Sequence, residues 1–95
     1  MSREEVIRRA DDAARVLNEK VVVDALMSIK QEIIDQWEAT PARDTEGREW
    51  IWRHYKVAQK FEGILRGCIE AGKMEKALLQ RETGWKDKLK AVVNY

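Results

Sequence analysis

The sequence has 95 residues, which is room for one domain with a modest core. Apolar residues make up 44% of it and charged residues 37%, with five glycines and one proline, a composition typical of long solvated helices rather than of a sheet or a disordered chain. The net charge of +1 does not favour nucleic acid or an acidic target as partner. No apolar run approaches the ~20 residues of a membrane span, and the charged N-terminus does not resemble a secretory signal. We therefore expect a soluble, intracellular, all-α protein.

A first helix is predicted over residues 3–17. Ser2 and Glu5 have the spacing of a capping box, in which each side chain accepts a hydrogen bond from a free amide at the start of the helix. The apolar positions that follow have helical spacing and are mostly alanine. Such a face packs close to another helix but buries little area.

A second helix is predicted over residues 19–39, with Asn18 as a plausible cap. Its apolar positions again have helical spacing; they are Val22, Leu26, Ile29, Ile33 and Trp37. Thr40 and Pro41 stop this helix, because a residue before proline avoids the α region. Asp44 caps the next helix after a short turn, so the second and third helices are expected to form a long antiparallel hairpin.

The third helix is predicted over residues 45–71, with Gly72 as its C-cap and a possible extension over 74–81. Seven positions form a heptad-like seam, expected to face the second helix; they are Trp50, His54, Val57, Phe61, Ile64, Cys68 and Ala71. A neighbouring stripe comprises Ile51, Tyr55, Ala58, Leu65 and Ile69. Two adjacent stripes exceed what one partner helix covers, so we expect self-association or another protein partner.

Thr83 and Gly84 are expected to end the helical domain, 1–82, and to begin an amphipathic tail, 83–95. In the tail, Trp85, Leu89 and Val92 have the spacing of one helical face, and most of the charged residues around them are lysines. The predicted partner-binding residues are therefore Ile51, Trp52, Tyr55, Trp85, Leu89 and Val92. For Trp52, the alternative is packing beneath the first helix.

Catalysis is not expected. His54 is the single histidine and Cys68 the single cysteine; on one helix they lie ~21 Å apart, too far for a dyad. The sequence has no phosphate-binding glycine loop and no Cys/His metal spacing, and we expect no cofactor.

Two further features leave alternatives open. Gly63 and Gly67 lie within the third helix, where each costs about 1 kcal/mol relative to alanine. They indicate either close packing of another helix, such as the alanine face of the first, or a kink. Arg53, Lys56 and Lys60 lie on one face and could bind nucleic-acid phosphates, the alternative being an ordinary solvated face.

The stretch Asp35–Glu49, followed by Trp52 and by Gly72-Lys73, resembles short helical proteins encoded by tailed bacteriophages and prophages. The resemblance covers roughly residues 15–75 and implies a location in the host cytoplasm or in the virion. It brings no catalytic residues. We expect a non-enzymatic phage structural or assembly protein that forms a homo-oligomer or docks on a larger phage protein. The alternatives are a DNA-packaging accessory similar to a terminase small subunit, which binds nucleic acid, and an inhibitor of a host factor.

Overall fold

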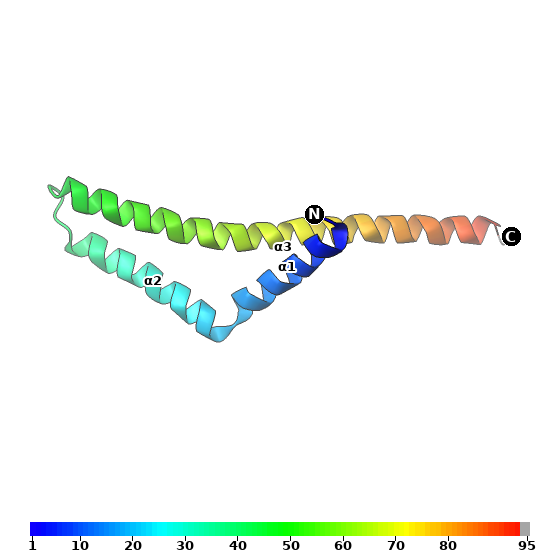
Figure 1. Cartoon of the computed structure of the whole chain (residues 1–95), viewed down its shortest axis with the longest axis horizontal. Helices are drawn as coiled ribbons and strands as arrows, with labels where there is room; N and C mark the ends of the chain where they lie inside the picture. The colour runs from blue at the N-terminus through cyan, green and yellow to red at the C-terminus, as the bar shows by residue number, and fades with distance from the viewer. Residues whose placement is uncertain (94–95) are drawn as a thin grey trace.

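The computed structural model describes the backbone of residues 1–93 and the side chains of residues 1–90. It contains three helices, α1 (Arg3–Asn18), α2 (Lys20–Ala39) and α3 (Thr45–Val93), and no strand among the described residues (Figure 1). The predicted all-α class is therefore confirmed.

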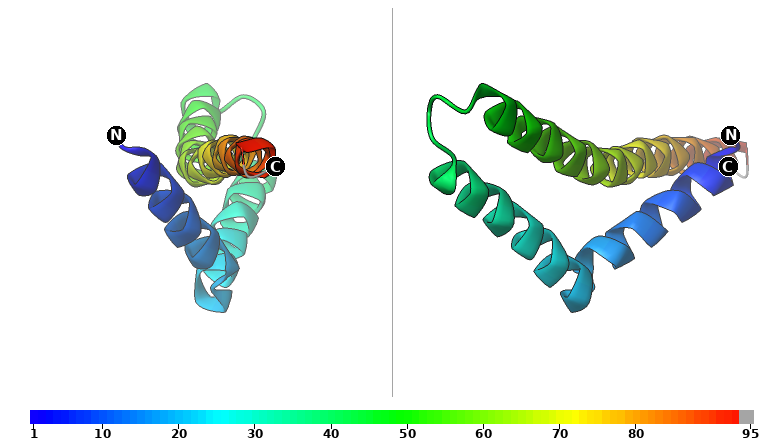
Figure 2. Two further views of the ribbon diagram at one scale, coloured as in Figure 1. Left: turned by 90° about the vertical axis from the view of Figure 1, so that its right-hand side faces the viewer. Right: turned by 60° about the vertical axis from the view of Figure 1, so that its left-hand side comes forward.

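The three helices form a triangle with one side extended. α3 is the long side, and its 49 residues correspond to about 74 Å at 1.5 Å per residue. It accounts for the longest dimension of the molecule, which measures 77 × 26 × 20 Å. α1 and α2 are the two shorter sides and meet at an apex remote from α3 (Figures 1 and 2). The last part of α3 projects beyond the N-terminus of α1 with no other helix beside it (Figure 1).

Local capping explains where the helices begin and end. The Glu5 amide donates to Ser2 Oγ at 3.2 Å, and the Gly47 amide donates to Asp44 Oδ1 at 3.0 Å. Both bonds satisfy an amide that has no partner within its own helix. Thr40 is extended before Pro41 and ends α2, as predicted. Between α1 and α2, the single extended residue is Glu19, whereas the predicted cap, Asn18, is the last residue of α1.

α3 does not end at Gly72, and the predicted break at Thr83 and Gly84 does not occur either. No glycine among the described residues has the positive φ that a helix-ending glycine adopts. A right-handed helical glycine costs only about 1 kcal/mol, and most residues between 73 and 82 are strong helix formers. Thr83 Oγ1 donates to the Leu79 carbonyl at 2.9 Å, so its side chain is accommodated within the helix. The predicted tail therefore continues α3 without a break as far as Val93.

The packing differs from the predicted hairpin. The turn does bring α2 and α3 together at one end, but α2 diverges from α3 toward the apex, and α1 makes the more extensive packing on α3 (Figure 1). Ala10 and Gly72 approach each other closely, and a Cβ on the glycine would overlap the Ala10 Cβ. Gly72 is thus the position that allows the alanine face of α1 to contact α3.

This contact decides which stripe of α3 faces inward. Gly72 continues the column formed by Ile51, Ala58 and Leu65 in steps of seven residues, and these four residues are buried or half-buried. The seam from Trp50 to Ala71, predicted to face inward, lies to one side and is largely exposed. The neighbouring stripe, apart from the exposed Tyr55, is therefore the one that faces inward, and most of the seam predicted to do so is exposed.

Candidate protein-binding surface

The core formed by the three helices is very small. Ala10, Ala13 and Ile51 are 4–5% exposed, and Gly72 is the fourth buried residue among those whose side chains are described. Ile51 was predicted to contact a partner; in the single chain its side chain is 4% exposed and lies beside residues of α2. Most other large apolar side chains of α2 and α3 are exposed.

The exposed apolar side chains form a continuous strip along the first half of α3, which we call the outer seam. Its large apolar members are 49–69% exposed; they are Trp50, Val57, Phe61 and Ile64. His54 belongs to the same strip, and its ring lies 3.8 Å from the Trp50 ring, centroid to centroid. Contiguous exposed apolar patches on this scale mark interaction sites in folded proteins.

A groove of about 610 Å³ runs between the outer seam and α2. Leu26 and Ile29 of α2 and Val57 and Phe61 of α3 line its apolar part. Charged residues also line it: Glu32 on the α2 side, and Arg53 on the α3 side.

A second groove, of about 320 Å³, lies near the turn between α2 and α3. Trp52 and Tyr55 line it opposite Ile34 and Trp37, with the buried Ile51 also part of its lining. Trp52 therefore does not pack beneath α1, the alternative considered for it, and is 58% exposed. Its ring lies 5.4 Å from Lys56 Nζ, within the range of a cation–π contact.

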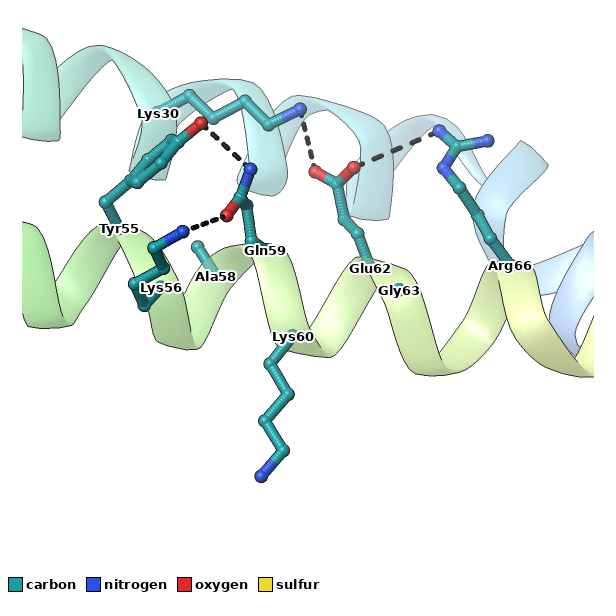
Figure 3. A pocket seen from close by; sticks show the side chains of 9 residues that line it. All are labelled: Lys30, Tyr55, Lys56, Ala58, Gln59, Lys60, Glu62, Gly63 and Arg66. Carbon is teal, nitrogen blue, oxygen red and sulfur yellow. Dashed lines mark hydrogen bonds and ion pairs between the residues drawn. The ribbon is translucent and has the colours of Figure 1, made fainter.

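The predicted basic strip does not converge on one point. Arg53 pairs with Glu49 at 3.9 Å, and Lys56 Nζ donates to Gln59 Oε1 at 3.5 Å. Figure 3 shows Lys60 extending away from α2, on the opposite side of α3 from the Lys56–Gln59 contact. The three side chains therefore present separate charges along the helix rather than one phosphate-sized site.

An ionic groove of about 710 Å³ lies on the same side as Gln59 (Figure 3). Glu62 forms ion pairs with Lys30 of α2 at 2.8 Å and with Arg66 of α3 at 3.9 Å. Gln59 Nε2 donates to Tyr55 Oη at 2.9 Å. The Lys30–Glu62 pair links α2 to α3, and the other two contacts lie within α3.

Gly63 and Gly67 do not contact α1, contrary to one of the readings considered for them. A Cβ at either position would meet no atom within 4 Å, and a close contact with a second chain stays a prediction for them. Sequence reasoning missed Gly72 as the packing glycine because the same residue also fits a helix end. The available signal was its place, in steps of seven, on the column of Ile51, Ala58 and Leu65.

Ion pairs hold the N-terminal end of α1 on α3. Arg3 contacts Glu75 at 3.0 Å and Glu82 at 2.8 Å, and Lys76 contacts Asp11 at 2.8 Å. The hydrogen bond from Arg3, together with its charge, holds the pKa of Glu82 below its usual range. The same contacts, with Glu82 first and Glu75 second, raise the pKa of Arg3.

The C-terminal part of α3 presents an exposed apolar face. Trp85 is 64% exposed and Leu89 is 46% exposed. Val92 was predicted to belong to the same face, and its side chain lies outside the described residues. The predicted contact residues Trp85 and Leu89 are therefore exposed on the continuous helix α3 rather than on a separate tail.

In the part of the chain that the structure describes, no three histidine, cysteine or acidic side chains gather as a metal site would require, and no helix is both long and apolar enough to cross a membrane. No protein-family model, curated protein or solved structure matches this chain.

Proposed function

We propose that this protein is a non-enzymatic helical interaction protein. Its outer seam and the flanking groove would be covered by another copy of the chain or by a larger protein on which it docks. The observation that carries the proposal is the contrast between four buried residues and an apolar strip that is about half exposed along its length. A side chain of this size contributes on the order of 1.5–3 kcal/mol when it is fully buried. Covering the strip would thus add several kcal/mol of stabilisation that the single chain does not obtain.

The contacts of the polar residues support a structural rather than a catalytic role. The ring of His54 packs on Trp50, and its Nδ1 lies 3.1 Å from the Trp50 carbonyl oxygen. Glu62 is engaged by two cations, and the acids of α3 nearest α1 are engaged by Arg3. Glu62, Glu75 and Glu82 are thus used to hold α2 and α1 against α3.

We further propose a tailed phage as the setting, with the protein acting in virion structure or assembly. The resemblance of residues 35–49, Trp52 and Gly72-Lys73 to short phage proteins supports this setting. The extended shape also supports it, because a 77 Å molecule with one helix exposed along its side can bridge neighbouring subunits.

Size-exclusion chromatography coupled to light scattering tests the proposal. We expect a mass that is a multiple of 11.1 kDa and rises with concentration to a defined oligomer. A mass of one chain at every concentration would contradict self-association. Mass spectrometry of purified particles then separates a virion component from an inhibitor of a host factor, which would be missing from them.

A further inference from the structure

We infer that α3 pairs with α3 of a second copy of this chain as a parallel, in-register, two-stranded coiled coil. The inference rests on the proposed self-association and specifies its geometry. α3 is continuous, so residues that the sequence analysis assigned to a domain and to a tail lie on a single helix.

One column of α3 repeats every seven residues along almost the whole helix. Every member is apolar and exposed: Trp50, Val57, Ile64, Ala71, Leu78 and Trp85. A companion column completes the 4,3 spacing of a coiled-coil seam and consists of His54, Phe61, Cys68, Glu75, Glu82 and Leu89. The outer seam is the first half of this longer heptad strip.

A strict seven-residue repeat identifies the partner as a helix. On a straight α-helix such a repeat drifts by about 20° per heptad, so another straight surface would lose contact with it after a few turns. Two helices that wind around each other in a left-handed supercoil keep the repeat at their interface throughout. α1 and α2 leave the first column exposed, and Arg3 of α1 reaches the companion column.

Two acids of the companion column already have counter-charges. Glu75 and Glu82 would lie at the interface, where an unpaired carboxylate is unfavourable. Arg3 of the same chain contacts both, at 3.0 and 2.8 Å. Arg3 of α1 therefore supplies the counter-charge that Glu75 and Glu82 need when another chain packs against this part of α3.

The charges beside the strip favour a second copy in parallel orientation. One flank of the strip has basic residues at four of its six heptad positions: Arg53, Lys60, Arg81 and Lys88. In an antiparallel pair with full overlap the same flanks meet, so Arg53 would face Lys88 of the other copy and Lys60 would face Arg81, and like charges repel.

In a parallel pair the basic flank meets the opposite flank of the second copy. Arg53 then lies beside Ala58 of the other chain, in a groove where Glu32 already faces that chain's own Arg53. Lys60 lies beside Leu65 of the other chain, in a groove lined by one acid and one base, Asp12 and Arg9. The parallel pair therefore avoids the like-charge contacts of Arg53 and Lys60, and retains one like-charge contact on this flank, between Arg81 and Lys86.

Disulfide trapping in the full-length chain tests orientation and register together. Val57→Cys and Leu78→Cys are each introduced with Cys68→Ser, and Lys73→Cys with Cys68→Ser is the matched control on the far side of α3. A parallel in-register pair brings each seam cysteine against its own copy. We therefore expect both seam variants to form covalent dimers with copper phenanthroline at least about tenfold faster than the control, since cysteines with Cα atoms more than about 7 Å apart do not bridge.

The possible results separate this inference from the proposed function. If all three variants form covalent dimers at the same rate, or if only one seam variant does so quickly, the parallel in-register pair is wrong. The proposed function would still stand in that case, provided that the unmodified protein has an oligomeric mass. A single-chain mass for the unmodified protein would overturn self-association and this inference with it, and would leave docking on a larger protein as the proposed function. Circular dichroism of each variant before oxidation shows whether its helix content is unchanged.

Discussion

The contact between Ala10 and Gly72 gives the sharpest test of the fold. A Cβ at Gly72 would overlap the Ala10 Cβ and would also come within 3.6 Å of Ala10 Cα and 3.7 Å of the Val6 carbonyl oxygen. Because two of these atoms belong to the backbone of α1, the helix itself has to move. At Gly63, by contrast, a Cβ would meet nothing within 4 Å. The same substitution at the two positions therefore separates helix propensity from packing.

Gly63→Ala should stabilise the protein by about 1 kcal/mol, the usual gain from replacing a helical glycine. Gly72→Ala gains the same propensity but also overpacks the contact, which costs about 1–3 kcal/mol. The melting temperature of Gly72→Ala, followed by circular dichroism at 222 nm, should therefore lie at least about 4 °C below that of Gly63→Ala.

A compensating variant checks the cause of this difference. Ala10→Gly combined with Gly72→Ala moves the methyl group from α1 to α3 and removes the overlap, so its stability should return to within about 1 kcal/mol of the unmodified chain. If Gly72→Ala melts as high as Gly63→Ala, then α1 does not dock at Gly72 and the described packing is wrong.

Three further results are expected. Asp44→Ala removes the cap of α3 and should lower stability by about 1 kcal/mol in thermal melts. The pKa of Glu82, measured by carboxyl NMR, should lie below the usual glutamate range and return to it in Arg3→Gln. Because the folded pKa is the lower one, this contact stabilises α1 on α3 above the usual glutamate pKa and is lost as the pH falls through the folded value. Finally, gel shifts at low salt should show no DNA binding, since the charges of Arg53, Lys56 and Lys60 do not converge; retardation that disappears with added salt would revive the packaging alternative.

Local signals in the sequence were sufficient to place most of the helix ends. The Ser2 cap, the proline after Thr40 and the Asp44 cap each depend on residues within a few positions of one another. Helix ends set by such short-range chemistry can be predicted from sequence. Gly72 shows the limit, because a glycine serves equally well as a helix end and as a close contact within a helix. Only the position of Ala10, 62 residues away in the sequence, decides between them.

The candidate surface could be predicted only in part for the same reason. Two apolar stripes on α3 were apparent from periodicity, and they indicated that more apolar surface is present than one partner helix can cover. Which stripe α1 and α2 cover depends on a long-range contact, so Ile51 was assigned to the partner and the Trp50–Ala71 seam to the core, the reverse of the structure. The extension of the seam to Trp85 and Leu89 became apparent once α3 was seen to be continuous.

The central claim is that the outer seam is covered by another copy of this chain. Sedimentation equilibrium of the unmodified protein, of Ile64→Lys and of Gln59→Lys tests it most directly, because the two variants add the same charge on opposite sides of α3. We predict oligomers for the unmodified protein and for Gln59→Lys, and a single-chain mass with unchanged helix content for Ile64→Lys. Equal masses for Ile64→Lys and Gln59→Lys would contradict the claim.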